Sequence, residues 1–509
     1  MFFNTSNTNI RINTGCFFII PLFIPNKKLF LALLFWYMIG KEGSVEKMLF
    51  DLKEYENKKV HFIGIGGVSM SGLAAILLNN QVKVTGSDFK ESKNTEKLKE
   101  RGAIIFYGHH KENITDQDIV VYTAAIREDN EELKEARAKG IKTYDRAEFL
   151  GHLIKNFTNS IAVTGTHGKT STTSMLSAIS LADEKDPTIL VGANLPLIGG
   201  NYRIGDSDFF ITEACEYKAS FMQFPGKVAL ILNVEADHLD YYRDLQHILD
   251  TFKEYITVMP KEGTVVANAD DPNMDYILQD AEVEVLTFGI HKGRLNAENI
   301  KFDEMGRASF DVILDGKLLM PIHLKVPGEF NIYNALGAIG ASLSSGISME
   351  GIKKGLEGYE GVDKRFQHLY TKNGIIVLDD YAHHPGEIKS ALDTVLKMKH
   401  NKVHVVFQSH TYTRTKALFQ EFSECFDDMD TLLLLPIFAA REPDTGLVTS
   451  EQLGDAIRAR DTVKTINVTE FDEAARYLKD IAQPGDIILT MGAGESVKVA
   501  EALEPLLLD

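Results

Sequence analysis

Cysteine is scarce in this 509-residue chain: there are three, Cys16, Cys215 and Cys425, and none forms a CxxC pair. This argues against a disulfide scaffold and against a thiolate zinc site, and it favours a reducing compartment. Basic residues are also few, with 54 Lys and Arg against 72 Asp and Glu. The formal charge of −18 disfavours nucleic acid as a partner, although an anionic substrate needs only a local positive site. An ordinary composition, 44% hydrophobic and 25% charged, excludes collagen-like and disordered chains, and the length predicts about three domains.

The chain also lacks an apolar run long enough to span a bilayer. The most apolar segment, residues 17–39, holds the only tryptophan, Trp36, but residues 25–28 (PNKK) divide it into runs of about 8 and 11 residues. A span needs roughly 20 apolar residues, and no signal-peptide cleavage pattern is present. We expect no stable membrane insertion. We interpret residues 1–47 as an extension ahead of a true start at Met48, with a weak membrane anchor as the alternative.

From Met48 onward, apolar strands alternate with helices. This order predicts an α/β fold of parallel sheets with helices on both faces, and ligand sites at the carboxyl ends of the strands. Breaks near residues 156–159 and 361–367 predict domains at 48–157, 158–364 and 365–509. Expected strands cover 59–65, 81–85, 119–123, 160–164, 209–213, 228–233, 264–268, 374–379, 403–407, 431–436 and 486–490, with helices at 70–79 and 131–139.

A first glycine-rich motif, residues 64–72 (GIGGVSMSG), stands between a strand and a helix. Glycines let the backbone approach a pyrophosphate, and a helix N-terminus supplies free N–H donors. The strict GxGxxG pattern fails at Ser69, so an NAD site, a UDP-sugar diphosphate site and a tight packing turn all remain open. The candidate UDP-sugar-binding residues are Gly64, Gly66, Gly67, Ser69, Ser71 and Asp88.

A second motif, residues 161–171 (IAVTGTHGKTS), has the strand, glycine loop, Lys-Thr and helix order of a phosphate cradle. Backbone N–H groups would hold ATP phosphates, Lys169 would add a positive charge, and the Thr170 hydroxyl can ligate Mg²⁺. The candidate ATP-binding residues here are Gly165, Thr166, His167, Gly168, Lys169, Thr170 and Ser171.

Two further segments, 213–217 (EACEY) and 233–240 (NVEADHLD), end apolar strands that we expect to reach the same sheet edge as the phosphate loop. Carboxylate oxygen and imidazole can bind Mg²⁺ beside a threonine hydroxyl, although Mg²⁺ prefers oxygen. The sequence therefore predicts a magnesium site of Thr170, Glu213 and His238.

The short loop GTHGKT resembles that of the Mur ligase and folylpolyglutamate synthetase group. Four later segments, together with the opening GIGGVSMSGLA, resemble the alanine-adding branch of the Mur ligase family. They are 327–335 (PGEFNIYNA), 363–367 (DKRFQ), 379–385 (DDYAHHP) and 407–415 (FQSHTYTRT). The chain departs from the family pattern at Lys364, Ser409 and Thr411; the last replaces a frequent Arg and removes an expected contact to the amino acid.

This resemblance implies a cytoplasmic enzyme of peptidoglycan precursor synthesis that joins L-alanine to the lactyl carboxylate of UDP-N-acetylmuramate. ATP would form an acyl phosphate, with Mg²⁺ as cofactor, and the alanine amine would then attack it. The implied domains are a Rossmann-like UDP-binding domain, a central P-loop-type ATPase and a Rossmann-like C-terminal ligase domain. The implied catalytic residues are Lys169, His383, His384, Arg414 and the hinge residue Arg365; Asn331 and Asp380 would bind ATP.

The resemblance also predicts closure of the third domain over the other two. A carbamylated lysine found in several Mur ligases would fall on Phe252, with Lys253 one position away, so we expect no such modification. Alternatives are a relative that adds a di- or tripeptide, an NAD-dependent dehydrogenase and a nucleotide-sensing binding protein. The phosphate loop and the FQSHTYTRT segment argue against them. The oligomeric state is not predicted.

Overall fold

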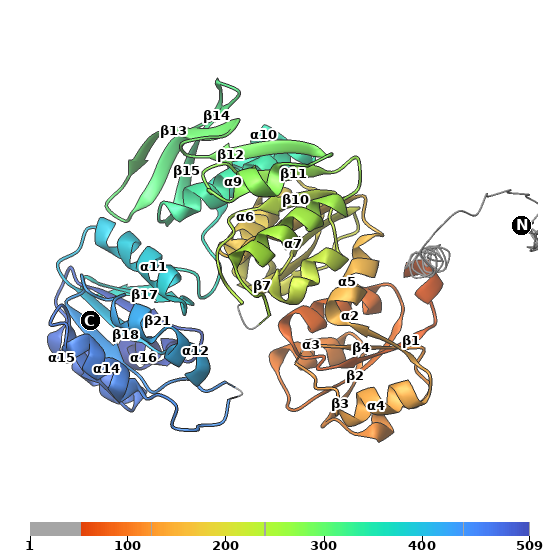
Figure 1. Ribbon diagram of the computed structural model, residues 1–509, viewed down its shortest axis with the longest axis horizontal. Helices are drawn as coiled ribbons and strands as arrows, with labels where there is room; N and C mark the ends of the chain where they lie inside the picture. The colour runs from red at the N-terminus through yellow and green to blue at the C-terminus, as the bar shows by residue number, and fades with distance from the viewer. Residues whose placement is uncertain (1–51, 124, 239–240, 441, 508–509) are drawn as a thin grey trace, which may run out of the picture. The chain divides into compact units, whose positions relative to one another are not determined.

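In the computed structural model, the described residues are 52–123, 125–238, 241–440 and 442–507 (Figure 1). Residues 1–47, with Trp36, and the expected start Met48 lie outside them, as do residues 239–240 of the NVEADHLD segment. Three sheets organise the described part of the chain. No helix in that part is both long enough and apolar enough to cross a bilayer.

The first sheet has five parallel strands in the order β3-β2-β1-β4-β5. The strands are β1 (Lys59–Ile63), β2 (Lys83–Asp88), β3 (Ile104–Tyr107), β4 (Ile119–Tyr122) and β5 (Lys142–Asp145). The helices that follow β1, β2, β4 and β5 are, in that order, α2 (Val68–Asn79), α3 (Lys93–Glu100), α4 (Glu131–Ala138) and α5 (Arg146–Ile154). The strands are short, β1 and β4 are mostly apolar, and the carboxyl ends of β1 and β2 carry the first glycine motif and Asp88.

The second sheet has ten strands in the order β15-β14-β13-β12-β11-β10-β6-β9-β7-β8. The strands are β6 (Asn159–Thr164), β7 (Thr188–Leu195), β8 (Gly200–Arg203), β9 (Phe209–Glu213), β10 (Val228–Ile231), β11 (Thr264–Asn268), β12 (Glu284–Gly289), β13 (Leu295–Phe302), β14 (Arg307–Leu314) and β15 (Lys317–Pro327). The helices are α6 (Lys169–Ala182), α7 (Leu245–Thr257), α8 (Met274–Leu278), α9 (Phe330–Ser344) and α10 (Met349–Gly358). Alternate residues of β10 enter two different cores: Val228 and Leu230 join α6 and α9, whereas Ala229 and Ile231 join α7.

The third sheet has six strands in the order β16-β17-β21-β18-β19-β20. The strands are β16 (Gln367–Lys372), β17 (Ile375–Asp380), β18 (Val403–Phe407), β19 (Thr431–Leu434), β20 (Lys464–Asn467) and β21 (Ile487–Met491). The helices are α11 (Pro385–Lys397), α12 (Tyr412–Ala417), α13 (Phe419–Ser423), α14 (Ser450–Arg458), α15 (Phe471–Ile481) and α16 (Val497–Leu503). Both faces are covered, because its strands contribute to two separate apolar clusters.

The α/β fold class predicted from the sequence is confirmed, and each expected strand and helix occurs within a few residues of its predicted place. The parallel sheets expected from the sequence also contain antiparallel pairs, which are β7–β8, β13–β14–β15 and β16–β17. Buried and exposed residues alternate in β14 and β15, as in strands with one exposed face, and a search for continuous apolar runs does not detect such strands. The three sheets span residues 59–145, 159–327 and 367–491, and the domain boundaries themselves remain predictions.

Candidate active site

The phosphate loop joins β6 to α6 and opens toward solvent at the helix N-terminus. Gly168, the N-cap of α6, has φ +84°, and a Cβ there would lie 2.5 Å from the Asn334 amide oxygen. Asn233 fixes the loop from β10: its side-chain oxygen accepts the His167 N–H at 2.7 Å and its carbonyl accepts the Thr166 N–H at 2.9 Å. The free N–H groups of the first turn are therefore held in place for an anion.

Lys169 is folded back over this loop. Its ammonium donates to the carbonyl oxygens of Gly165 and Thr166 and lies 2.9 Å from a carboxylate oxygen of Glu216. Burial disfavours the ammonium, but the charge and hydrogen bond of Glu216, together with the nearby Cys215 and Glu213, outweigh it and raise the pKa of Lys169. Burial likewise opposes the Glu216 carboxylate, and Lys169 lowers the pKa of that group. The two charges therefore form a buried, fully ionised pair.

A cluster suited to a cation lies beside this pair. Glu216, Asp237 and His238 each offer one ligand atom, and the three atoms lie within 4.8 Å of one another. Thr170 lines the same cavity. The Glu216 oxygen that pairs with the Lys169 ammonium at 2.9 Å accepts no hydrogen bond from the described residues, so a metal would compete with Lys169 for it. Two carboxylates, an imidazole and a hydroxyl fit Mg²⁺, with water completing the shell.

Of the three predicted magnesium ligands, the structure brings Thr170 and His238 together but places Glu213 apart from them. The Glu213 carboxylate accepts the backbone N–H of Gly192 and lines a different cavity. Glu216 takes that place because it lies beyond the end of β9, in the turn before residues 217–223. Sequence reasoning missed Glu216 and Asp237, although both lie inside the quoted motifs.

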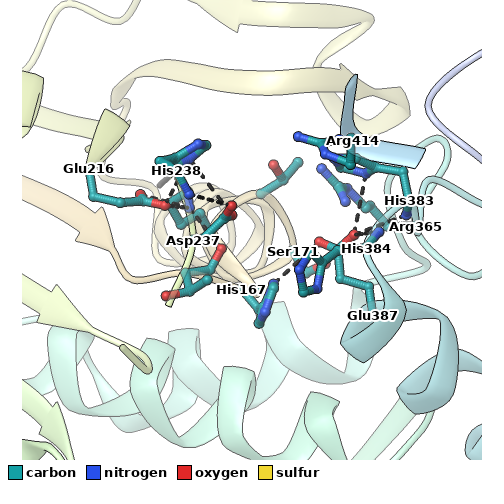
Figure 2. A pocket seen from close by; sticks show the side chains of 14 residues that line it. His167, Ser171, Glu216, Asp237, His238, Arg365, His383, His384, Glu387 and Arg414 are labelled. Carbon is teal, nitrogen blue, oxygen red and sulfur yellow. Dashed lines mark hydrogen bonds and ion pairs between the residues drawn. The ribbon is translucent and has the colours of Figure 1, made fainter. Parts of the chain in front are cut away.

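A cavity of about 170 Å³ joins the phosphate loop to the third sheet (Figure 2). Its lining residues are Thr166, His167, Gly168, Lys169, Thr170, Ser171, Glu216, Asp237, His238, Arg365, His383, His384, Glu387 and Arg414. All five predicted catalytic residues are among them. The Arg414 guanidinium has one buried nitrogen without a hydrogen-bond partner among the described residues, so it can bind an incoming anion. Arg365 lies over the Tyr381 ring, 4.9 Å from its centroid.

The two adjacent histidines differ in tautomer. Nδ1 of His383 lies 2.9 Å from the Tyr381 carbonyl oxygen, which can only accept, so Nδ1 carries the proton and Nε2 keeps a lone pair. Nδ1 of His384 instead accepts the Gly386 N–H at 3.4 Å, so its neutral ring carries the proton on Nε2. Burial lowers the pKa of both rings, and each is neutral near pH 7.

His167 connects the phosphate loop to two carboxylates. Its Nε2 lies 3.5 Å from Glu235 and its Nδ1 lies 3.3 Å from Glu387 of α11. Burial opposes the charged ring, but the two carboxylates outweigh it and raise the pKa of His167 to about 9. His167 is therefore cationic at neutral pH. Glu387 is the third residue of α11, and no sequence motif described above singles it out.

A second cavity, of about 320 Å³, also adjoins the loop, and its volume lies within the range of small-molecule sites. Phe330, Tyr333 and Asn334 form part of its wall, together with Asp380. Burial raises the pKa of Asp380 to about 6, and its carboxylate accepts the N–H groups of Phe366 and Ala382 at 2.7 Å.

The predicted adenine contact Asn331 lines none of the cavities described. Its side-chain N–H donates to the Pro327 carbonyl oxygen, and its side-chain oxygen accepts from the Asn334 amide. Asn331 therefore holds the side chain of Asn334, which does line the cavity of about 320 Å³.

A third cavity, of about 350 Å³, lies between the first glycine motif and the second sheet, and Gly67 and Ser69 line it. Asp88 and Ser71 do not: Asp88 accepts the Gly66 N–H at 2.8 Å, and the buried Ser71 hydroxyl donates to the Val68 carbonyl. Gly64, with φ +84°, makes the turn into this loop.

Helices α7 and α12 carry two further positions named in the sequence analysis, residues 252–253 and Thr411. Phe252 is fully buried against Phe221, while Lys253 lies 2.6 Å from Asp280. Thr411, the N-cap of α12, accepts the Arg414 N–H at 3.4 Å through its hydroxyl. Thr411 therefore caps α12, the helix that carries Arg414.

Comparison with known proteins matches three family models in order. "Mur ligase family, catalytic domain" matches residues 59–158, "Mur ligase middle domain" 163–342 and "Mur ligase, glutamate ligase domain" 364–494. The chain is 53% identical to the UDP-N-acetylmuramate–L-alanine ligases of Clostridium perfringens (strain 13 / Type A), over 454 residues, and Clostridium beijerinckii, over 455 residues. Each match covers 89% of this chain and 99% of the relative.

Among solved structures, the UDP-N-acetylmuramate–alanine ligase MurC of Thermotoga maritima matches with a TM-score of 0.74 and 27% identity, over 88% of this chain and 98% of that one. A murein peptide ligase of Psychrobacter arcticus shares the fold, with a TM-score of 0.64 and 23% identity over 89% of this chain and 99% of that one. With its phosphate loop, its histidine pair and these relatives, the chain belongs to the Mur ligase family.

Proposed function

We propose that the protein is an ATP-dependent ligase that joins L-alanine to the lactyl carboxylate of UDP-N-acetylmuramate, a step of peptidoglycan precursor synthesis. The observation that carries the proposal is one cavity in which a phosphate loop meets His383, His384 and Arg414. The family and the 53% identical relatives that bear this activity in their names support it. ATP and UDP-sugars are cytoplasmic substrates, and we place the reaction there.

Phosphoryl transfer comes first in the proposed reaction. The α6 N-terminus and Lys169 bind the phosphates of ATP and neutralise charge as the lactyl carboxylate attacks. Thr170, Glu216, Asp237 and His238 would hold Mg²⁺, which supplies further charge neutralisation when bound. Lys169 must leave Glu216 to reach the nucleotide, so ATP and Glu216 compete for its ammonium.

Amide formation follows. His383 is the better proton acceptor of the two histidines because its Nε2 lone pair is free, whereas His384 presents an N–H. His383 takes the proton from the alanine amine as nitrogen attacks the acyl phosphate, and phosphate leaves. The free nitrogen of Arg414 binds the alanine carboxylate or the acyl phosphate.

The UDP-sugar is assigned to the cavity of about 350 Å³ at the first glycine motif. Gly67 and Ser69 face this cavity directly, and Asp88 shapes it by holding the Gly66 N–H. The nucleoside of ATP is assigned to the cavity beside Asp380 and Asn334. The reacting groups then meet at the phosphate loop, which lies between the two.

Phosphate release from ATP tests the proposal. Release should require ATP, Mg²⁺, UDP-N-acetylmuramate and L-alanine together, with glycine, L-serine and an L-alanyl peptide as competing acceptors. Equal ATP hydrolysis without the sugar nucleotide would disprove the ligase function, and a preference for the peptide would indicate the peptide-adding relative. His383→Gln should lower kcat about 100-fold or more, and His384→Gln, the matched control, should lower it less.

A further inference from the structure

Glu387 is the third residue of α11, and its carboxylate holds the start of that helix. Oε2 accepts the backbone N–H of His383 at 3.0 Å and that of His384 at 3.2 Å, which makes a capping box with His384 as N-cap. The segment that carries both histidines is therefore fixed by one side chain.

The same carboxylate contacts two histidine rings, the neutral His383 and the cationic His167. Its Oε2 lies 3.3 Å from Nδ1 of His383, and its Oε1 lies 3.3 Å from Nδ1 of His167 in the phosphate loop (Figure 2). His167 in turn pairs with Glu235. Glu387 lines both the cavity of about 170 Å³ at the phosphate loop and the adjoining cavity of about 320 Å³, so it forms part of the wall between them.

We infer that Glu387 is a positioning residue: it fixes the backbone and ring of His383, and it ties them to the phosphate loop through His167. This inference rests on the proposed function, in which His383 accepts the proton. The contact between Glu387 and His167 gives a reason for a histidine in the phosphate loop. Binding of phosphate would by itself need only the backbone N–H groups and Lys169. The contact also sets the distance between the base and the bound nucleotide.

The electrostatic setting agrees with this role. The charged groups that face His383 are Glu387, Arg414 and Arg365, with the His410 ring 5.8 Å away. Burial and the arginines lower the pKa of His383, and Glu387 opposes them. Burial opposes the Glu387 charge, but His167 outweighs it and the pKa of Glu387 falls well below its usual range. The carboxylate is therefore ionised at every pH at which the enzyme would work.

Glu387→Ala and Glu387→Gln test the inference. Alanine removes the cap, the contact with the His383 ring and the ion pair with His167, and we expect kcat to fall about 100-fold with less than threefold change in KM for ATP. Glutamine keeps an oxygen that can accept the two N–H groups but loses the charge, and we expect about a 10-fold fall. In the double variant with His167→Gln, Glu387→Gln should add almost nothing to the effect of His167→Gln alone, because the two residues act as one unit.

Gln452→Ala is the matched control. Gln452 holds the equivalent third position of α14 and accepts the Thr449 N–H at 3.0 Å, but it lines none of the site cavities. We expect it to lower the melting temperature less than Glu387→Ala, which also breaks the pair with His167, and to leave kcat unchanged. A kcat for Glu387→Ala within threefold of wild type would overturn the inference, as would equal losses of kcat in the two capping variants.

A spectroscopic measurement separates this inference from the proposed function. In ¹⁵N spectra of histidine-labelled protein without substrates, His383 should show protonated Nδ1 in the wild type and a mixture of tautomers in Glu387→Ala. An unchanged His383 tautomer in Glu387→Ala contradicts the positioning role. A wild-type enzyme without ligase activity contradicts the proposed function, and the tautomer measurement remains decisive for Glu387.

Discussion

Replacement of Lys169 by methionine separates the catalytic part of the phosphate loop from its contribution to folding. Lys169 and Glu216 form an ion pair at 2.9 Å, with only 16% and 3% of their side chains exposed. Removing the lysine leaves the Glu216 carboxylate buried, which costs about 3–5 kcal/mol for a broken buried pair. His238 lies 3.5 Å from Glu216 and offsets part of the loss, so we expect about 3 kcal/mol. For a domain of this size that is a fall in Tm of roughly 6–12 °C.

Lys169→Met should also abolish most activity, by about 10³-fold in kcat, because a phosphate clamp is lost. The double variant Lys169→Met/Glu216→Gln should recover most of the Tm, since no buried charge is left unpaired, but none of the activity. Tm is measured by calorimetry, and activity by phosphate release with all three substrates. Lys253→Met is the control, because its partner Asp280 is 69% exposed; it should change Tm by less than about 3 °C. A Lys169→Met protein as stable as wild type, or a double variant no more stable than Lys169→Met, would refute the reasoning.

Removing divalent cations with EDTA should stop phosphate release, and Glu216→Gln should raise the Mg²⁺ concentration needed for half-maximal rate; an unchanged requirement would contradict the assigned ligand. Asp380→Asn should raise KM for ATP about 10-fold, because the carboxylate that accepts two backbone N–H groups shapes the nucleoside cavity, and an unchanged KM would argue against that assignment. His167 has a folded pKa of about 9, above about 6.5 when unfolded, so its stabilisation is complete below pH 6.5 and disappears as pH rises through 9. His167→Gln should therefore destabilise by on the order of 1–2 kcal/mol at pH 6 and much less at pH 9.5 in chemical denaturation; equal losses at both would refute the ion pairs. Scattering curves should become more compact with an ATP analogue and UDP-N-acetylmuramate together, and identical curves would contradict domain closure.

The sequence alone determined the features that depend on local order. Strand, glycine loop and Lys-Thr occur consecutively in residues 161–171, so the phosphate loop and its helix follow from short-range sterics and N–H geometry. Buried parallel strands such as β6 and β10 are continuous apolar runs, and they were predicted to within a few residues. Strands β13, β14 and β15 each have exposed as well as buried residues, so they contain no continuous apolar run by which the sequence could predict them.

Only the tertiary structure decided which polar groups meet. Glu213 and Glu216 are three residues apart in one motif, yet the end of β9 directs Glu213 to the Gly192 N–H and the following turn brings Glu216 to Lys169. His383 and His384 are adjacent, yet a carbonyl and an N–H give them opposite tautomers. Contacts of this kind join residues far apart in the chain, as between Glu387 and His167, and their energies depend on burial and on distances within a few tenths of an ångström. Burial and interatomic distance are both determined by how the sheets and helices pack, and the order of residues in a motif does not specify either.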